Sequence, residues 1–188
     1  MTASDVLRRI TGALTGAGIP YMLAGSFASA YYGAVRSTRD IDLVIEATPA
    51  QLTDFIRSLP AEQYYADLDA ALEAHKRESL FNVIDMTTGW KIDLIIRKAR
   101  AFSREEFRRR QLVKLHDLAL FVASAEDVIV SKLEWSKLAQ SARQMEDVAA
   151  ILRMRSESLD RSYLEKWIVE LGLESQWNDA QRSARLSD

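Results

Sequence analysis

The sequence contains no cysteine, which excludes disulfide bonds and zinc sites built on thiolate ligands. It has only three prolines and seven glycines among 188 residues, and this argues against a long disordered tail. The 25 lysines and arginines are balanced by 27 aspartates and glutamates, which gives a formal net charge of -2. The chain as a whole therefore does not resemble a strongly basic nucleic-acid binder, although a local basic patch remains open.

Long apolar runs are also absent. No run approaches the length that spans a membrane, and the first residues, MTASDVLRRITGAL, are too polar for the apolar core of a secretory signal peptide. We therefore expect a cytoplasmic protein with no membrane partner. Hydrophobic residues make up 48% of the chain, which suits one domain with an appended element or two small domains.

The order of the expected elements changes near residue 122. Before this point, short β-branched segments alternate with stretches of helical periodicity, and LFNVIDMTTGWKIDLIIRK predicts a β-hairpin. From Ser124 onward only helical patterns remain. The sequence thus predicts an α/β domain over residues 1–122 and a C-terminal helical bundle over residues 123–188.

Capping patterns predict where several helices begin, because a side-chain oxygen just before a helix accepts hydrogen bonds from its first free N–H groups. The predicted signals are Ser4, Thr48-Pro49-x-Gln51, Ser103-x-x-Glu106 and Ser124-x-x-Asp127.

Two acids stand two residues apart in DIDLVIE, whose alternating pattern predicts a strand. Residues two apart on a strand share a face, so Asp40 and Asp42 point to one side while Ile41 and Leu43 face the core. Two carboxylates this close repel each other unless a proton or a cation lies between them, and oxygen ligands suit magnesium. A solvated acid pair at the end of a strand is the structural alternative.

A third acid stands in a matching segment, since WKIDLII repeats the pattern of RDIDLVI. If the two strands are neighbours, Asp93 joins Asp40 and Asp42 on one face. Three carboxylates on adjacent strands suit a pair of magnesium ions about 4 Å apart, which clamp the attacking and leaving oxygens of a phosphoryl transfer. The alternative is a strand-end acid that pairs with Lys91 or Arg97.

The turn at Gly25-Ser26 suits a phosphate, because glycine allows close approach to the backbone and the following helix offers free N–H groups. A serine that only caps the helix is the alternative. Arg36 and Arg39, just before the acid pair, could bind phosphate oxygens; a salt bridge to Asp40 or to a nearby glutamate is the competing interpretation.

The stretch AGSFASAYYGAVRSTRDIDLVI resembles the signature of the polymerase-beta-like nucleotidyltransferase superfamily. That signature consists of Gly-Ser, a helix, Asp-x-Asp on the next strand and a third acid on a later strand. The matching positions are Gly25, Ser26, Asp40, Asp42 and Asp93. The resemblance is to small bacterial members, including the nucleotidyltransferase-like toxins of toxin–antitoxin and abortive-infection systems, and it implies a mixed β-sheet flanked by helices.

A later segment, IVSKLEWSKLAQSARQMEDVAAIL, also resembles those toxins, with Lys132, Arg143 and Asp147 as counterparts. We expect Lys132 near the start of a helix, where a cation is unfavourable to the helix dipole. This hints at a contact with the triphosphate, and an ordinary surface lysine is the alternative.

The resemblance implies transfer of a nucleoside monophosphate from an NTP, such as ATP, to an RNA, protein or small-molecule acceptor, with release of pyrophosphate. Asp40 and Asp42 would bridge two Mg²⁺ ions, and Asp93 would complete the site and accept a proton. Candidate acceptors include a tRNA end or a protein hydroxyl, and a toxin-like member would have an antitoxin partner. The alternative is a catalytically degenerate member that acts as a nucleotide- or partner-binding module.

Two further features are expected to be structural. His75 and His116 have no second histidine at ligand spacing, so both are expected to be solvated. The basic run EEFRRRQLVK is expected to form a solvated helix face, with contact to an RNA acceptor as the alternative.

Overall fold

The computed structural model describes residues 2–115, 117–139 and 141–185. The chain forms two compact units. Residues 1–24 and 37–122 belong to the first unit, and residues 25–36 and 123–188 belong to the second. The predicted division into residues 1–122 and 123–188 stays a prediction about domains; the compact units differ from it in placing residues 25–36 with the C-terminal part.

The first unit is built on a mixed β-sheet, as predicted. In the described part of the chain this sheet has seven strands in the order β3-β4-β5-β2-β1-β7-β6. Strand β2 is parallel to β5 and β1 is parallel to β7, and the other neighbouring pairs are antiparallel. The strands are β1 (Tyr21–Leu23), β2 (Asp40–Ile45), β3 (Tyr64–Ala66), β4 (Leu80–Asp85), β5 (Trp90–Ile96), β6 (Gln111–Leu115) and β7 (Leu118–Val122).

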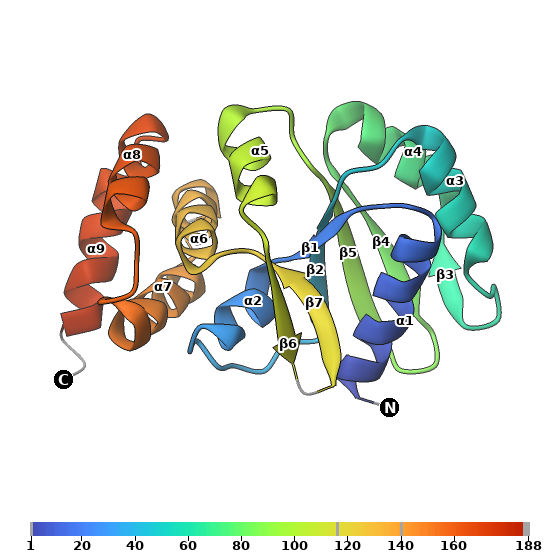
Figure 1. The fold of residues 1–188 in the computed structure, drawn as a ribbon, viewed down its shortest axis with the longest axis horizontal. Helices are drawn as coiled ribbons and strands as arrows, with labels where there is room; N and C mark the ends of the chain where they lie inside the picture. Colours follow the sequence, from blue (N-terminus) through green and yellow to red (C-terminus); the bar gives the residue numbers. More distant parts are fainter. Residues whose placement is uncertain (1, 116, 140, 186–188) are drawn as a thin grey trace. The chain divides into compact units, whose positions relative to one another are not determined.

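Helices complete the first unit, and α3 packs between α1 and α4 (Figure 1). The helices are α1 (Ala3–Gly16), α3 (Pro49–Ser58), α4 (Leu68–Arg77) and α5 (Ala101–Arg108). Alternate residues of the central strands are fully buried, among them Ile41, Leu43, Ile92 and Leu94. Burial of each such side chain stabilises the fold by about 1.5–3 kcal/mol. Because side chains alternate between the two faces of a strand, this burial fixes the polar residues of β2 and β5 on the opposite face of the sheet.

The second unit contains only helices in its described residues, as the periodicity from Ser124 onward predicts. They are α2 (Gly25–Tyr31), α6 (Ala125–Ala139), α7 (Ala142–Arg155), α8 (Arg161–Glu170) and α9 (Glu174–Arg185). Helix α7 packs against α6 and α9, and α2 contacts α6 and α7. Leu133, Val148, Ile151 and Leu164 are at most 1% exposed and form much of the interior.

Two of the predicted capping signals are confirmed. Thr48 caps α3 in a reciprocal capping box with Gln51. The Ser124 hydroxyl accepts a hydrogen bond from the backbone N–H of Asp127 at 3.2 Å and donates one to its carboxylate at 2.7 Å.

The other two capping predictions are wrong. Thr2, not Ser4, caps α1, because Thr2 and Asp5 form the reciprocal pair that satisfies both backbone groups. Helix α5 begins at Ala101, after Arg100, and the Ser103 hydroxyl instead accepts a hydrogen bond from Nε of Arg100 at 2.9 Å. Ser103 and Glu106 have the residue types and spacing of a capping box. However, Ser103 lies inside the first turn of α5, whereas a capping residue must directly precede the helix.

The basic run EEFRRRQLVK does not form a continuous helix face. Helix α5 ends at Arg108, and the edge strand β6 begins at Gln111. Arg108 pairs with Glu105 at 2.6 Å, and the Arg110 guanidinium lies 4.3 Å from the centre of the Phe107 ring. These cations are therefore engaged within the protein.

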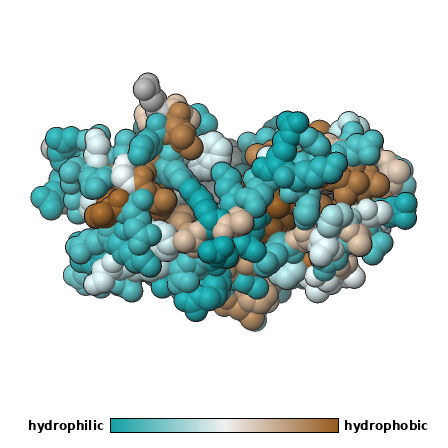
Figure 2. Space-filling view, turned by 90° about the horizontal axis from the view of Figure 1, so that it is seen from above, coloured by the Kyte–Doolittle hydropathy of each residue, from teal (hydrophilic) through white to brown (hydrophobic). Residues whose placement is uncertain are grey.

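The molecular face shown in Figure 2 is mainly hydrophilic, with hydrophobic residues in separate patches. Among the described residues, none of the helices combines the length and the apolar character needed to cross a bilayer.

Candidate functional site

Three of the predicted site residues lie on one face of the sheet in the first unit. Strands β2 and β5 run parallel and in register, so that Asp42 is the direct neighbour of Asp93 and Asp40 is the neighbour of Lys91. Neighbouring residues on adjacent strands point to the same face. Asp40, Asp42 and Asp93, here termed the carboxylate cluster, therefore share the face opposite the buried isoleucines and leucines.

The carboxylate cluster already contains a positive charge. The Nζ atom of Lys91 lies 3.1 Å from Oδ2 of Asp93 and 3.6 Å from Oδ1 of Asp40. Burial lowers the pKa of the Lys91 ammonium, but its hydrogen bond to Asp93 and the charges of Asp93 and Asp40 outweigh this, so the pKa is raised. The alternative pairing of Asp93 with Lys91 is what the structure shows, while Arg97 pairs with Glu46 at 2.6 Å.

Asn82 is a member of this site that the sequence did not indicate. Its side-chain amide donates a hydrogen bond to Oδ1 of Asp93 at 2.5 Å. The antiparallel register of the hairpin makes Asn82 the direct neighbour of Asp93 on β4. The predicted hairpin already contained this pairing, because counting outward from its turn places Asn82 opposite Asp93. Nothing else in the sequence singled out Asn82 as a site residue.

Within the described residues, no group of three or more histidine, aspartate and glutamate side chains is arranged so that it could hold a metal ion. At the carboxylate cluster, Lys91 and Asn82 contact the two carboxylate oxygens of Asp93. The donor set nevertheless fits magnesium, which prefers carboxylate oxygens. A magnesium site at the carboxylate cluster therefore stays a prediction, and it requires Lys91 to give up its contacts.

A second group of predicted residues lies together in the second unit. Nε of Arg36 lies 3.3 Å from Oδ2 of Asp147, and the Arg36 guanidinium also donates a hydrogen bond to the Ser26 hydroxyl. Nζ of Lys132 donates to the same Asp147 oxygen at 2.6 Å and to the Gln144 side chain at 2.8 Å. We term Ser26, Arg36, Lys132 and Asp147 the buried ionic network.

This network corrects two predictions. Lys132 lies in the middle of α6, not near its start, so the dipole argument does not apply to it. It is only 4% exposed, so it is not an ordinary surface lysine either. Buried charges are costly unless they are paired, and Asp147, also 4% exposed, provides the pairing for Lys132 and for Arg36. The loosely matched Lys132 and Asp147 are thus brought into direct contact.

The remaining candidates stand apart from these contacts. Gly25 begins α2 with a φ of 56°, a backbone conformation that favours glycine. Arg39 and Arg143 are exposed, and within the described ranges their side chains form no ion pair or hydrogen bond. His75 lies in the last turn of α4, and His116 lies outside the described residues.

Comparison with known proteins gives a likeness in structure but not in sequence. No model of a protein family matches the chain, and no curated protein sequence matches it. An antigenic nucleotidyltransferase-like protein from Paracoccidioides brasiliensis matches 96% of this chain and 91% of its own, with a TM-score of 0.56 and 14% identity. The chain has a nucleotidyltransferase-like fold. The antibiotic-resistance factor ANT(2'')-Ia also matches, over 97% of both chains, with a TM-score of 0.56 and 13% identity.

The fold class predicted from the signature is confirmed by these likenesses. The roles of the carboxylate cluster and of the buried ionic network, the Mg²⁺ ions and the toxin-like character stay predictions.

Proposed function

We propose that this chain is a magnesium-dependent nucleotidyltransferase that moves a nucleoside monophosphate from an NTP to the hydroxyl group of an acceptor. The observation that carries the proposal is the register of β2 and β5, in which Asp42 and Asp93 are neighbours and Asp40 shares their face. The nucleotidyltransferase-like fold supports the same reaction class.

In the proposed reaction, the acceptor oxygen forms a bond to the α-phosphorus of the NTP. The bond from this phosphorus to the bridging oxygen breaks, and pyrophosphate leaves with the electron pair. Asp93 would accept the proton of the attacking hydroxyl, and Asp40 and Asp42 would hold magnesium together with Asp93. When bound, two magnesium ions would supply positive charge that stabilises the attacking and the leaving oxygens.

A second set of residues is proposed to bind phosphate oxygens of the nucleotide. The Ser26 hydroxyl and the Arg36 guanidinium are suited to phosphate oxygens, and Gly25 and Arg39 flank them in sequence. Asp147 fixes the orientation of Arg36, since it accepts from Nε, while the Ser26 hydroxyl accepts from the same guanidinium. Lys132 is proposed as a positioning residue that holds Asp147, because its ammonium is buried against that carboxylate.

The decisive experiment measures magnesium-dependent NTP binding by calorimetry in the wild type and in the Asp40→Asn, Asp42→Asn double variant. We expect binding in the wild type and a loss of at least about tenfold in the variant, since these carboxylates would hold the magnesium that the triphosphate needs for binding. A matched control is the Asp54→Asn, Glu62→Gln double variant, which removes two exposed charges from elsewhere in the same unit. Both variants should unfold cooperatively at a temperature close to that of the wild type.

Pyrophosphate release with candidate acceptors then tests the transfer itself. Equal NTP binding in the wild type and in the Asp40, Asp42 variant, or binding in neither, would contradict the metal-dependent reaction. Nucleotide binding without magnesium, and with no pyrophosphate release, would instead support the degenerate nucleotide-binding module.

A further inference from the structure

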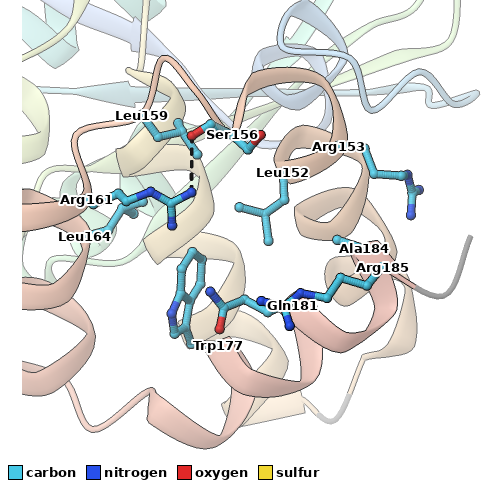
Figure 3. A pocket seen from close by; sticks show the side chains of 10 residues that line it. All are labelled: Leu152, Arg153, Ser156, Leu159, Arg161, Leu164, Trp177, Gln181, Ala184 and Arg185. Atoms are coloured by element: carbon cyan, nitrogen blue, oxygen red, sulfur yellow. Dashed lines mark hydrogen bonds between the residues drawn. The ribbon is translucent and has the colours of Figure 1, made fainter. Parts of the chain in front are cut away.

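A groove in the second unit is lined by arginines and an indole ring. It lies between α7, α8 and α9 and has a volume of about 320 Å³. In Figure 3, Arg161 and Trp177 lie on one side of the groove, and Arg153 and Arg185 lie on the other. Leu152 contributes an apolar wall between them.

The three arginines are only weakly engaged by the protein. Arg153 donates to the Ser183 carbonyl at 3.4 Å, and Arg161 donates to the Ser156 carbonyl at 3.5 Å, which are distances at the outer limit of hydrogen bonding. Over the described residues, no carboxylate pairs with Arg153, Arg161 or Arg185. Three like charges around one groove repel one another unless an anion lies between them.

Two carboxylates of α9 and of the start of α8 are used for other contacts. Asp160 caps α8, where it accepts a hydrogen bond from the backbone N–H of Tyr163 at 3.0 Å. Asp179 forms an ion pair with Arg182 one turn away on α9. Asp160 and Asp179 therefore form no ion pair with the groove arginines.

The indole ring indicates what kind of anion fits. Trp177 is half-buried and lies in the wall of the groove. Single-stranded nucleic acid is bound by the combination of cationic groups that follow the phosphates and aromatic rings on which bases stack. An acidic peptide would use the arginines but would have no base to place on the ring.

We propose that this groove binds a single strand of nucleic acid, whose phosphates contact Arg153, Arg161 and Arg185 and one of whose bases stacks on Trp177. The net charge of -2 is no obstacle, because the charge that matters is local to the groove.

The test uses the full-length protein with a chelator and no NTP, so that it does not depend on catalysis. Fluorescein-labelled RNA and DNA strands of the same sequence and about eight nucleotides are titrated with protein, and binding is followed by anisotropy. We expect the Arg161→Ala, Arg185→Ala variant to bind at least about tenfold more weakly, with a shallower salt dependence because two phosphate contacts are lost. The RNA and DNA arms distinguish which kind of strand the groove takes.

The matched control is the Arg57→Ala, Lys98→Ala variant, which makes the same change in net charge at exposed residues of the other unit. It should bind within about twofold of the wild type, since only general attraction is altered. Trp177→Leu keeps apolar volume and removes the stacking surface, so it should weaken binding at least about fivefold with little change in the salt slope. Thermal unfolding of each variant verifies that the helices still pack.

An equal loss of strand affinity in the Arg161→Ala, Arg185→Ala variant and in the control variant would overturn the proposal. A labelled polyglutamate peptide that binds the wild type as tightly as the strand does would also overturn it. If the strand binds through the groove but no pyrophosphate is released, the proposed function fails and the groove assignment stands. If transfer occurs but strand binding ignores the groove variants, only the groove assignment fails.

Discussion

Lys91 determines the charge balance of the carboxylate cluster. Its ammonium lies within 3.6 Å of both Asp40 and Asp93, whose like charges would otherwise repel each other. A divalent cation supplies the same compensation with more charge and more ligand positions. Lysine and metal therefore compete for the same oxygens in the proposed enzyme.

This competition yields a prediction for Lys91→Met, which keeps the length of the side chain and removes its charge. We expect Mn²⁺ to bind more tightly than to the wild type, by a factor of up to about five, because a partly exposed ion pair is worth at most about 1 kcal/mol. Manganese titration followed by electron paramagnetic resonance measures the affinity directly. Lys98→Met, an exposed lysine in the same unit, is the control and should leave the affinity unchanged. Weaker binding in Lys91→Met would show that the lysine helps to position the acids.

The buried acid Asp85 has a structural role that its residue type alone does not reveal. Asp85 is 0% exposed, forms an ion pair with Arg9, and accepts hydrogen bonds from the backbone N–H groups of Thr87 and Thr88 at 3.0 and 3.1 Å. It holds the turn of the hairpin that carries Asp93. In the sequence it is one more aspartate before a turn, and its burial depends on α1, which is distant along the chain.

The end of helix α2 depends on a glycine. Gly33 has a φ of 115°, and a Cβ atom at this position would lie 2.7 Å from Cγ of Met154 on α7. Any other residue would therefore combine backbone strain with a steric clash. Helix α2 ends at Tyr31, two residues before Gly33.

We expect Gly33→Ala to lower the free energy of unfolding by about 1–3 kcal/mol, because the left-handed conformation and the contact with Met154 both disfavour a side chain. Gly12→Ala is the matched control. Gly12 lies inside α1, and a methyl group added there would meet no atom within 4 Å, so its replacement should stabilise the protein by about 0.4–1 kcal/mol. Urea denaturation measures both changes. Equal effects of the two substitutions would contradict the strain at Gly33.

The second unit is assembled from two segments that are far apart in the sequence. Helix α2 follows β1 and precedes β2 along the chain, yet it is grouped with α6–α9 and contacts α6 and α7. The Tyr32 hydroxyl, just beyond α2, donates a hydrogen bond to the Ala123 carbonyl at 2.8 Å. Burial raises the pKa of Tyr32, which keeps this donor protonated.

Native-state hydrogen exchange tests this grouping. Leu133→Ala removes a fully buried side chain of α6 and should destabilise the second unit by about 2–5 kcal/mol. We expect the amides of α2 to lose protection together with those of α6 and α7, and more than those of β1 and β2. Leu94→Ala, at an equally buried position of β5, should give the opposite pattern. If the amides of α2 instead lose protection together with those of β1 and β2 in both variants, the grouping of α2 with the second unit is wrong.

The sequence by itself determined the elements that local patterns encode. Period-two alternation predicted the strands that carry Asp40, Asp42 and Asp93, and it placed each acid on the face opposite the core. The helical C-terminal part was predictable from its local periodicity. The caps at Thr48 and Ser124 were also predictable, because the hydrogen-bonding groups of a cap lie within a few residues of each other. The short edge strands β3 and β6 were missed because they have weak alternation and pair on one side only.

Only the tertiary structure decided which distant residues meet. It set the register that makes Asp42 the neighbour of Asp93, 51 positions along the chain, and the ion pairs of Lys91. It buried Lys132 against Asp147. It also left three arginines around Trp177 that form no ion pair with any carboxylate of residues 2–115, 117–139 and 141–185. These features arise when whole helices and strands pack together. The packing decides which charged side chains meet a partner, and no local sequence pattern specifies that partner.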